Sequence, residues 1–126
     1  YNAIIRKTAS QLGITSSQVY HLTSIPIGGI SMSQLANKLG LDSSTLTRNI
    51  QKLEKMELVI RTSGSYDKRI QNVTLTNQGT KILDEIEVLL LHIGHSIMEQ
   101  IDLDDQENIL DSLEKLVWSI DCIREE

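Results

Sequence analysis

The chain has 126 residues, 40% of them apolar, and a formal net charge of −5, which suits one domain or two small, intimately packed parts. It has no Phe, one Trp and a single cysteine, Cys122, so its core must be aliphatic, and an intrachain disulfide and a thiolate-rich zinc site are excluded. No apolar run is long enough to cross a membrane, and no signal peptide is visible, which favours a cytoplasmic protein. Because Tyr1 stands first in place of Met, we expect natural residues to precede it.

The charges are divided unequally along the chain. Residues 1–81 hold ten Lys/Arg and four Asp/Glu, a balance of +6, whereas residues 82–126 hold two and thirteen, a balance of −11. The two balances sum to the net −5. The negative total therefore hides a basic part that can meet a polyanion.

Two helices are predicted at the N-terminal end. Residues 2–12 form the first, and residues 16–25 form the second. The second helix begins at a capping box, in which Thr15 and Gln18 satisfy each other's backbone N–H groups. Pro26 follows and cannot continue the helix, so we expect it to end there.

A helix-turn-helix is predicted next. The capping pattern returns as S-M-S-Q at 31–34, and Gly40 ends the short helix that follows because glycine tolerates the left-handed conformation. Asp42 or Ser43 then caps a longer helix over residues 43–56. Two helices joined by such a tight turn have the arrangement of many DNA-binding modules.

The longer helix has two distinct faces. Leu46, Ile50 and Leu53 cluster on one side and are expected to be buried. On an isolated helix, the polar side opposite would indicate simple solvation, but after a capped helix and a tight turn it favours contact with nucleic acid. The side chains on and beside that polar face include no acid and are Ser44, Thr45, Thr47, Arg48, Gln51, Lys52 and Lys55.

A β-hairpin is predicted after this helix. Residues 58–62 and 71–75 are rich in β-branched side chains, and a glycine-containing loop joins them. The loop ends in S-Y-D-K-R-I, which puts Lys68 and Arg69 at the tip. A helix-turn-helix followed by a hairpin is a winged helix, and a basic tip on such a wing indicates a site for phosphate.

At this point the sequence resembles the MarR family of bacterial transcription regulators. Its entry motif appears as I-T-S-S-Q at 14–18, and its L-A-x-x-L helix appears at 35–39. Its S-T-x-T-R recognition segment stands at 44–48. Its wing signature, D-x-R followed by L-T-x-x-G, stands at 67–69 and 75–79. The short pieces are weakly specific, whereas the wing signature in register with the recognition segment is strong.

The resemblance implies a mainly α fold with a small β-hairpin. In it, residues 14–79 form a winged helix-turn-helix DNA-binding lobe, and residues 1–13 and 80–126 form a helical dimerisation region of the same continuous domain. It also implies a homodimeric, ligand-responsive repressor on a pseudo-palindromic site in double-stranded DNA. No Ser/His/Asp set, glycine-rich phosphate loop or metal constellation is present in the sequence, so we expect neither an enzyme nor a cofactor. One departure is Glu57, where the family usually has Gly; a left-handed Glu costs roughly 1 kcal/mol.

Individual roles follow as hypotheses. Arg48 and Gln51 would read base edges, and Arg69 would enter the minor groove, where negative potential is concentrated. Asp67 would not touch DNA but would hold the Arg69 guanidinium in a fixed pose. The helix would be positioned on phosphates by Ser44, Thr45, Thr47, Lys52 and Lys55, and Lys68 belongs to the same DNA-binding set.

Two long acidic helices are predicted over residues 80–101 and 103–124. The last carries apolar residues at spacings of 4, 3, 4 and 3, a short heptad seam. Such a seam indicates either an intrachain core or a dimer interface, and the resemblance favours the dimer. The seam residues are Ile109, Leu113, Leu116, Ile120 and Ile123.

An aromatic or phenolic effector is a further expectation drawn from the resemblance, although each candidate side chain is better explained as an ordinary core or surface residue. His92 and His95 are spaced to share a metal, but no third ligand is identifiable, so no metal site is predicted. The rival function is a winged-helix protein-interaction module that does not bind DNA. The candidate pocket residues are Tyr20, His21, His92, His95, Met98 and Trp118.

Overall fold

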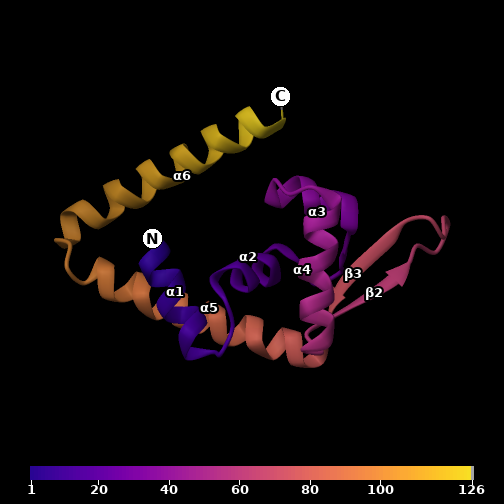
Figure 1. Cartoon of the computed structure of the whole chain (residues 1–126). Helices are drawn as coiled ribbons and strands as arrows, with labels where there is room; N and C mark the ends of the chain where they lie inside the picture. The colour runs from indigo at the N-terminus through magenta and orange to yellow at the C-terminus, as the bar shows by residue number, and fades with distance from the viewer. Residues whose placement is uncertain (126) are drawn as a thin grey trace. The chain divides into compact units, whose positions relative to one another are not determined.

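The computed structural model describes residues 1–125 and divides after Leu90 into two compact units. It is mainly helical with one small antiparallel sheet (Figure 1), as predicted. The elements in chain order are α1 (Asn2–Gln11), α2 (Ser16–Ser24), β1 (Ile30–Ser31), α3 (Met32–Leu39), α4 (Ser43–Lys55), β2 (Val59–Ser63), β3 (Gln71–Leu75), α5 (Asn77–Met98) and α6 (Leu103–Glu125).

Local capping fixes the helix-turn-helix. The Thr15 hydroxyl accepts from the backbone N–H of Gln18, whose side chain accepts from the Thr15 N–H, and the same reciprocal box opens α3. Gly40 ends α3 with φ of +65°, and Asp42 caps α4. Both capping boxes and the glycine stop are therefore confirmed, because each depends only on residues a few positions apart.

The sheet has three strands in the order β1-β3-β2. Strands β2 and β3 form the predicted hairpin, with Val59 opposite Leu75 and Ser63 opposite Gln71. The sheet also contains β1, which was not predicted and which pairs Ile30 with Val73 along the other edge of β3. A two-residue strand is too short to produce an alternating pattern in the sequence.

The core of the first unit is aliphatic, as expected for a chain without Phe. The predicted stripe of α4 is confirmed, since Leu46, Ile50 and Leu53 are at most 1% exposed. These side chains pack with apolar residues from the other elements of the unit, so α4 turns its polar face outward. The remaining core residues include Ile5, Ala9, Val19, Leu22, Ile25, Leu35, Leu58, Val59, Val73 and Ile86.

The L-T-x-x-G motif joins the base of the wing to α5. The Thr76 hydroxyl donates to the carbonyl of Glu57 at 2.6 Å and accepts from the Gly79 N–H at 2.9 Å. A Cβ at Gly79 would lie 1.9 Å from the Leu58 carbonyl oxygen, so only glycine fits. Because Thr76 caps the helix, α5 begins at Asn77, earlier than the predicted residue 80. Glu57 has the left-handed conformation, with φ of +59°.

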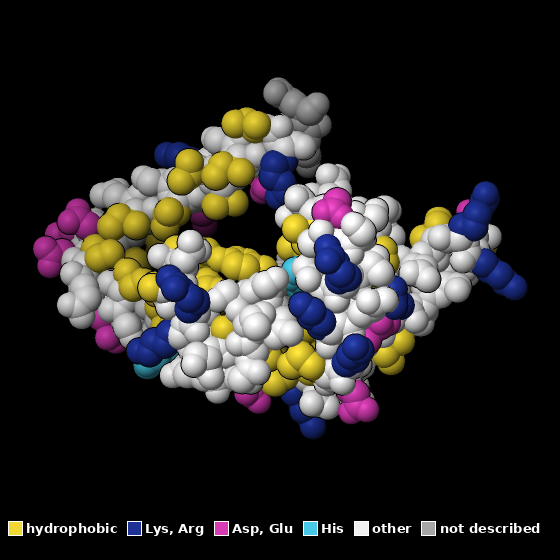
Figure 2. Space-filling view, viewed as in Figure 1, with side chains coloured by type: hydrophobic (Ala, Val, Ile, Leu, Met, Phe, Trp, Pro, Cys, Tyr) yellow, Lys and Arg dark blue, Asp and Glu magenta, His cyan; other side chains and the backbone are white. Residues whose placement is uncertain are grey.

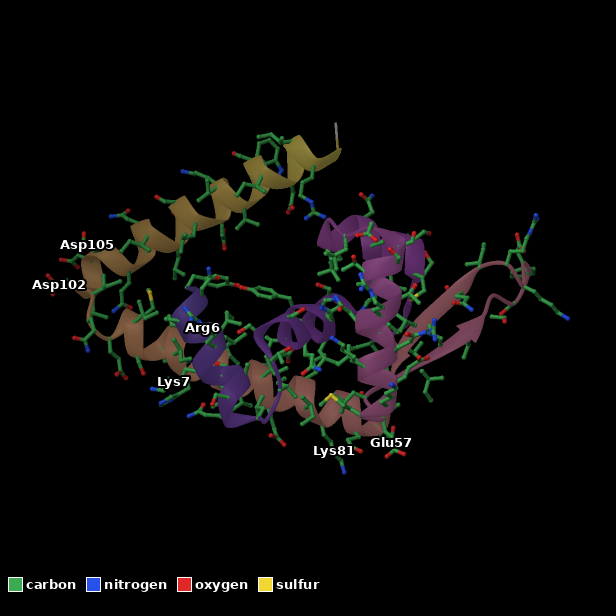
Figure 3. The ribbon with its side chains drawn as sticks, viewed as in Figure 1. Arg6, Lys7, Glu57, Lys81, Asp102 and Asp105 are labelled. Atoms are coloured by element: carbon green, nitrogen blue, oxygen red, sulfur yellow. The ribbon has the colours of Figure 1, made fainter. Side chains whose placement is uncertain are left out.

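The second unit contains the end of α5 and all of α6. The Gln106 side chain donates to the carbonyls of Met98 and Ile101, which fixes the turn between the helices. Asp102 and Asp105 point outward at this turn (Figure 3). Figure 2 shows hydrophobic side chains along α6, and its predicted seam is largely exposed, from 49% at Ile120 to 72% at Ile123. Among residues 1–125, no helix combines the length and apolarity needed to span a membrane.

Candidate nucleic-acid interface

The outer face of α4 carries a row of basic side chains. Arg48, Gln51, Lys52 and Lys55 are all exposed, and Figure 2 shows Lys and Arg side chains following this helix. Within residues 1–125, none of the four side chains has an intramolecular ion pair or hydrogen bond. Their donors are therefore available to a ligand outside the chain.

The hydroxyl groups at the start of α4 are used inside the protein. Ser44 and Thr45 each donate to a carboxylate oxygen of Asp42 at 2.6 Å, and Thr47 donates to the backbone carbonyl of Ser43 at 2.8 Å. Hydrogen bonds from Ser44 and then from Thr45 lower the pKa of Asp42 well below its ordinary range. Phosphate oxygens only accept hydrogen bonds, so these three hydroxyls can serve a phosphate only after leaving their internal acceptors.

The wing tip is held by a short network around Asp67. Its carboxylate Oδ1 accepts from the backbone N–H of Arg69 at 2.9 Å and from the Arg69 Nε at 3.2 Å. The Arg69 side chain nevertheless remains 92% exposed. Tyr66 and Lys68 are also exposed at this tip. Asp67 thus contacts Arg69 while most of the guanidinium stays in solvent.

A groove of about 320 Å³ separates the returning strand of the wing from the helix-turn-helix. Its walls come from the start of α3, the first half of α4 and the residues that follow the wing tip. The wing is therefore not packed against the first half of α4. The lining residues are Ser31, Met32, Ser33, Ser43, Leu46, Thr47, Arg69, Ile70 and Gln71.

One ion pair beside this interface was absent from the predictions. The Arg61 Nε and Nη2 donate to the two carboxylate oxygens of Glu54, each at 2.9 Å. Hydrogen bonding to the Glu54 carboxylate raises the pKa of Arg61 above its ordinary value. A sequence signal did exist, because Arg61 lies two residues after buried Val59 and therefore faces the same side of the sheet.

The candidate pocket residues are divided between the two units. In the first, His21 is 3% exposed and its Nε2 lies 3.1 Å from the Asn49 side-chain nitrogen, while Tyr20 donates to Asn2. His21 thus joins α2 to α4. The second unit contains Trp118, which is 70% exposed, and exposed His92 and His95 with half-buried Met98. No cluster of three metal-ligating side chains occurs within residues 1–125, and the effector pocket stays a prediction.

The sequence and the fold of this chain are similar to those of known transcription regulators. The MarR family profile matches residues 9–71, half of the chain. The regulator SarZ from Staphylococcus epidermidis is 31% identical over 90 residues, which are 70% of this chain and 58% of SarZ, so the chain spans little more than half the length of that relative.

Two solved structures show the same likeness. A MarR transcriptional regulator from Methanosarcina mazei is 27% identical, with a TM-score of 0.81 over 97% of this chain and 88% of the other. MarR from Escherichia coli, solved as a cysteine-to-serine mutant with operator DNA, is 26% identical, with a TM-score of 0.72 over 91% and 84% of the chains. The resemblance predicted from the sequence motifs is confirmed, and the chain belongs to the MarR family.

Proposed function

We propose that the chain is a sequence-specific DNA-binding transcription regulator. The observation that carries the proposal is the set of exposed cations on α4, which have no internal partner, together with the largely solvent-exposed Arg69 at the wing tip, in a chain whose net charge is −5. An α-helix fits the major groove, and an arginine on a neighbouring hairpin fits the minor groove. The similarity to Escherichia coli MarR, which was solved in complex with operator DNA, supports DNA as the partner.

Within this proposal, Arg48 and Gln51 reach base edges from α4, and Arg69 enters the minor groove with its orientation set by Asp67. The three lysines Lys52, Lys55 and Lys68 neutralise phosphates and make affinity dependent on salt. Ser44, Thr45 and Thr47 have a smaller part than the sequence implied, because their hydroxyl hydrogens already have internal acceptors.

We further propose that the working form is a homodimer assembled through residues 1–13 and 80–126. The exposed seam of α6 supports this, together with a groove of about 420 Å³ along the same helix that includes Leu113, Val117 and Trp118. Apolar surface of this extent is rarely left in contact with water. Two-fold pairing would present two copies of α4 to half-sites about one DNA turn apart.

Repression relieved by a small aromatic or phenolic effector completes the proposal. The exposed ring of Trp118, in the α6 groove, supports an aromatic ligand. The other candidates remain Tyr20, His21, His92, His95 and Met98. Binding of selected duplexes with and without simple phenols such as salicylate tests this part, and identical dissociation constants would count against it.

The experiment that tests DNA binding is selection of duplexes from a random pool, followed by titration at several salt concentrations. Arg69→Ala is expected to weaken binding at least about tenfold, and Arg48→Ala to relax base preference as well. Lys81→Ala is a matched control, because it removes a positive charge from an exposed site at the start of α5 (Figure 3). Equal losses of DNA affinity for Arg69→Ala and Lys81→Ala, or an affinity that does not change with salt concentration, would favour the protein-interaction module.

A further inference from the structure

The ion pair between Glu54 and Arg61 joins the two elements that the proposed function brings to DNA. Glu54 lies in the last turn of α4, and Arg61 lies in the middle of β2. Both N–H···O distances are 2.9 Å, the parallel arrangement in which a guanidinium and a carboxylate bind most strongly. The side chains are only 23% and 28% exposed, so water competes less than at an open surface pair.

The position of this pair along the wing matters. Closer to the base, the hairpin is fixed by buried Leu58 and Val59 and by the Thr76 hydroxyl on the Glu57 carbonyl, and buried Val73 lies directly opposite Arg61 on β3. Toward the tip, the groove of about 320 Å³ lies between the hairpin and the first half of α4. Within residues 1–125, no other hydrogen bond joins the hairpin to α4 nearer the tip.

We propose that Glu54 and Arg61 form a brace that sets the angle between α4 and the wing. The inference rests on the proposed DNA binding, for which Arg48 on α4 and Arg69 at the tip must reach one duplex together. A wing held at the right angle in the free protein loses less conformational freedom on binding. Glu54 and Arg61 are thus positioning residues, and their charges cancel beside the DNA.

The first test measures dissociation constants on a duplex selected from a random pool by the wild-type chain. Glu54→Gln keeps the shape of the side chain but loses the charged bidentate pair, and it is expected to weaken binding about tenfold. Glu87→Gln, at an exposed position of α5, removes the same charge and is expected to leave affinity nearly unchanged. The reversed pair, Glu54→Arg with Arg61→Glu, should recover part of the loss.

A second comparison separates a brace from a general stabilising contact. In the Glu54→Gln background, Arg69→Ala should cost less affinity than it does in the wild type, because a loosened wing contributes less. Arg48→Ala should cost the same in both backgrounds. If Glu54→Gln binds as Glu87→Gln does, or if the effect of Arg69→Ala is the same in both backgrounds, the brace is ruled out.

The brace can also be tested without DNA, by measuring the distance between the wing tip and α4. Spin labels at Tyr66→Cys and Lys55→Cys, in a Cys122→Ser background diluted with unlabelled chain, report the distance between wing tip and α4. Cys122 is exposed and would otherwise be labelled. Glu54→Gln should broaden the distance distribution, and equal widths would refute the brace. A broadened distribution, together with a wild-type chain that binds no duplex, would support the brace and refute the DNA-binding proposal.

Discussion

The two units of this chain differ in how far their apolar side chains are exposed. In the first, the large aliphatic side chains of α4 are at most 1% exposed. In the second, Leu110, Leu113, Leu116 and Val117 on α6 are 50–56% exposed. The same residue types at the same helical spacing therefore end in a closed core in one unit and on an open face in the other.

This contrast teaches that periodicity shows which face of a helix is apolar but not what covers it. The first unit has enough helices and strands to bury its own apolar core. The apolar face of the second unit is open in the single chain, and the occupant proposed above is a second copy of the chain, through its residues 1–13 and 80–126. The following substitutions, in order of decreasing effect, test whether the two units are stabilised in these different ways.

Gly79→Ala should have the largest effect. A Cβ at Gly79 would lie 1.9 Å from the Leu58 carbonyl oxygen, so the backbone must move, and the free energy of unfolding should fall by about 3–4 kcal/mol. Gly94→Ala in the same helix meets no atom within 4 Å and should raise it by roughly 0.5–1 kcal/mol. Urea denaturation checks both, and a loss for Gly94→Ala would mean that a partner approaches this glycine closely.

Leu113→Asp should act on association. Leu113 is 50% exposed in the single chain, so the substitution removes roughly 1 kcal/mol per copy and roughly 2 kcal/mol per dimer, and the dimer dissociation constant should rise about thirtyfold in analytical ultracentrifugation. Asn108→Asp adds the same charge on the flank of α6 outside the seam and should change it little. Equal increases in the dissociation constant for the two substitutions would indicate that added charge is the cause. If neither substitution changes the dissociation constant, α6 is not part of the dimer interface.

Glu57→Gly should stabilise the first unit slightly. Glu57 has a left-handed conformation, with φ of +59°, and relief of its strain raises the free energy of unfolding by about 1 kcal/mol. The greater conformational freedom of glycine in the unfolded chain offsets part of this gain. A net gain of about 0.5 kcal/mol is expected in thermal denaturation. Glu87→Gly, the same change within a helix, should instead destabilise by about 1 kcal/mol. A loss at both positions would contradict the strain at Glu57.

Asp42→Asn should have the smallest effect, and that effect should depend on pH. The folded state lowers the pKa of Asp42 from its ordinary value of 3.8, so the ionised carboxylate stabilises the protein above that value and loses its contribution as pH falls. The wild type should therefore be more stable than Asp42→Asn at neutral pH, and the difference should shrink below pH 3.8. A constant difference across acid urea titrations would argue against the cap.

The sequence by itself determined the helix-turn-helix and the outline of the wing. Thr15 with Gln18, the stop at Gly40 and the stripe from Leu46 to Leu53 all act within one or two helical turns, so their outcome follows from local order alone. The exposed basic face of α4 follows equally, because burial of one side of a helix leaves the opposite side in solvent.

Only the tertiary structure decided the rest. Gly79 is required by a carbonyl at Leu58, β1 exists because β3 offers a free edge, and Glu54 meets Arg61 across two different elements. Each of these depends on groups that folding brings together from separate elements of the chain. Interactions of that kind have no fixed spacing in the sequence. Strand alternation can indicate which side of the sheet Arg61 faces, but it does not identify the partner on another element.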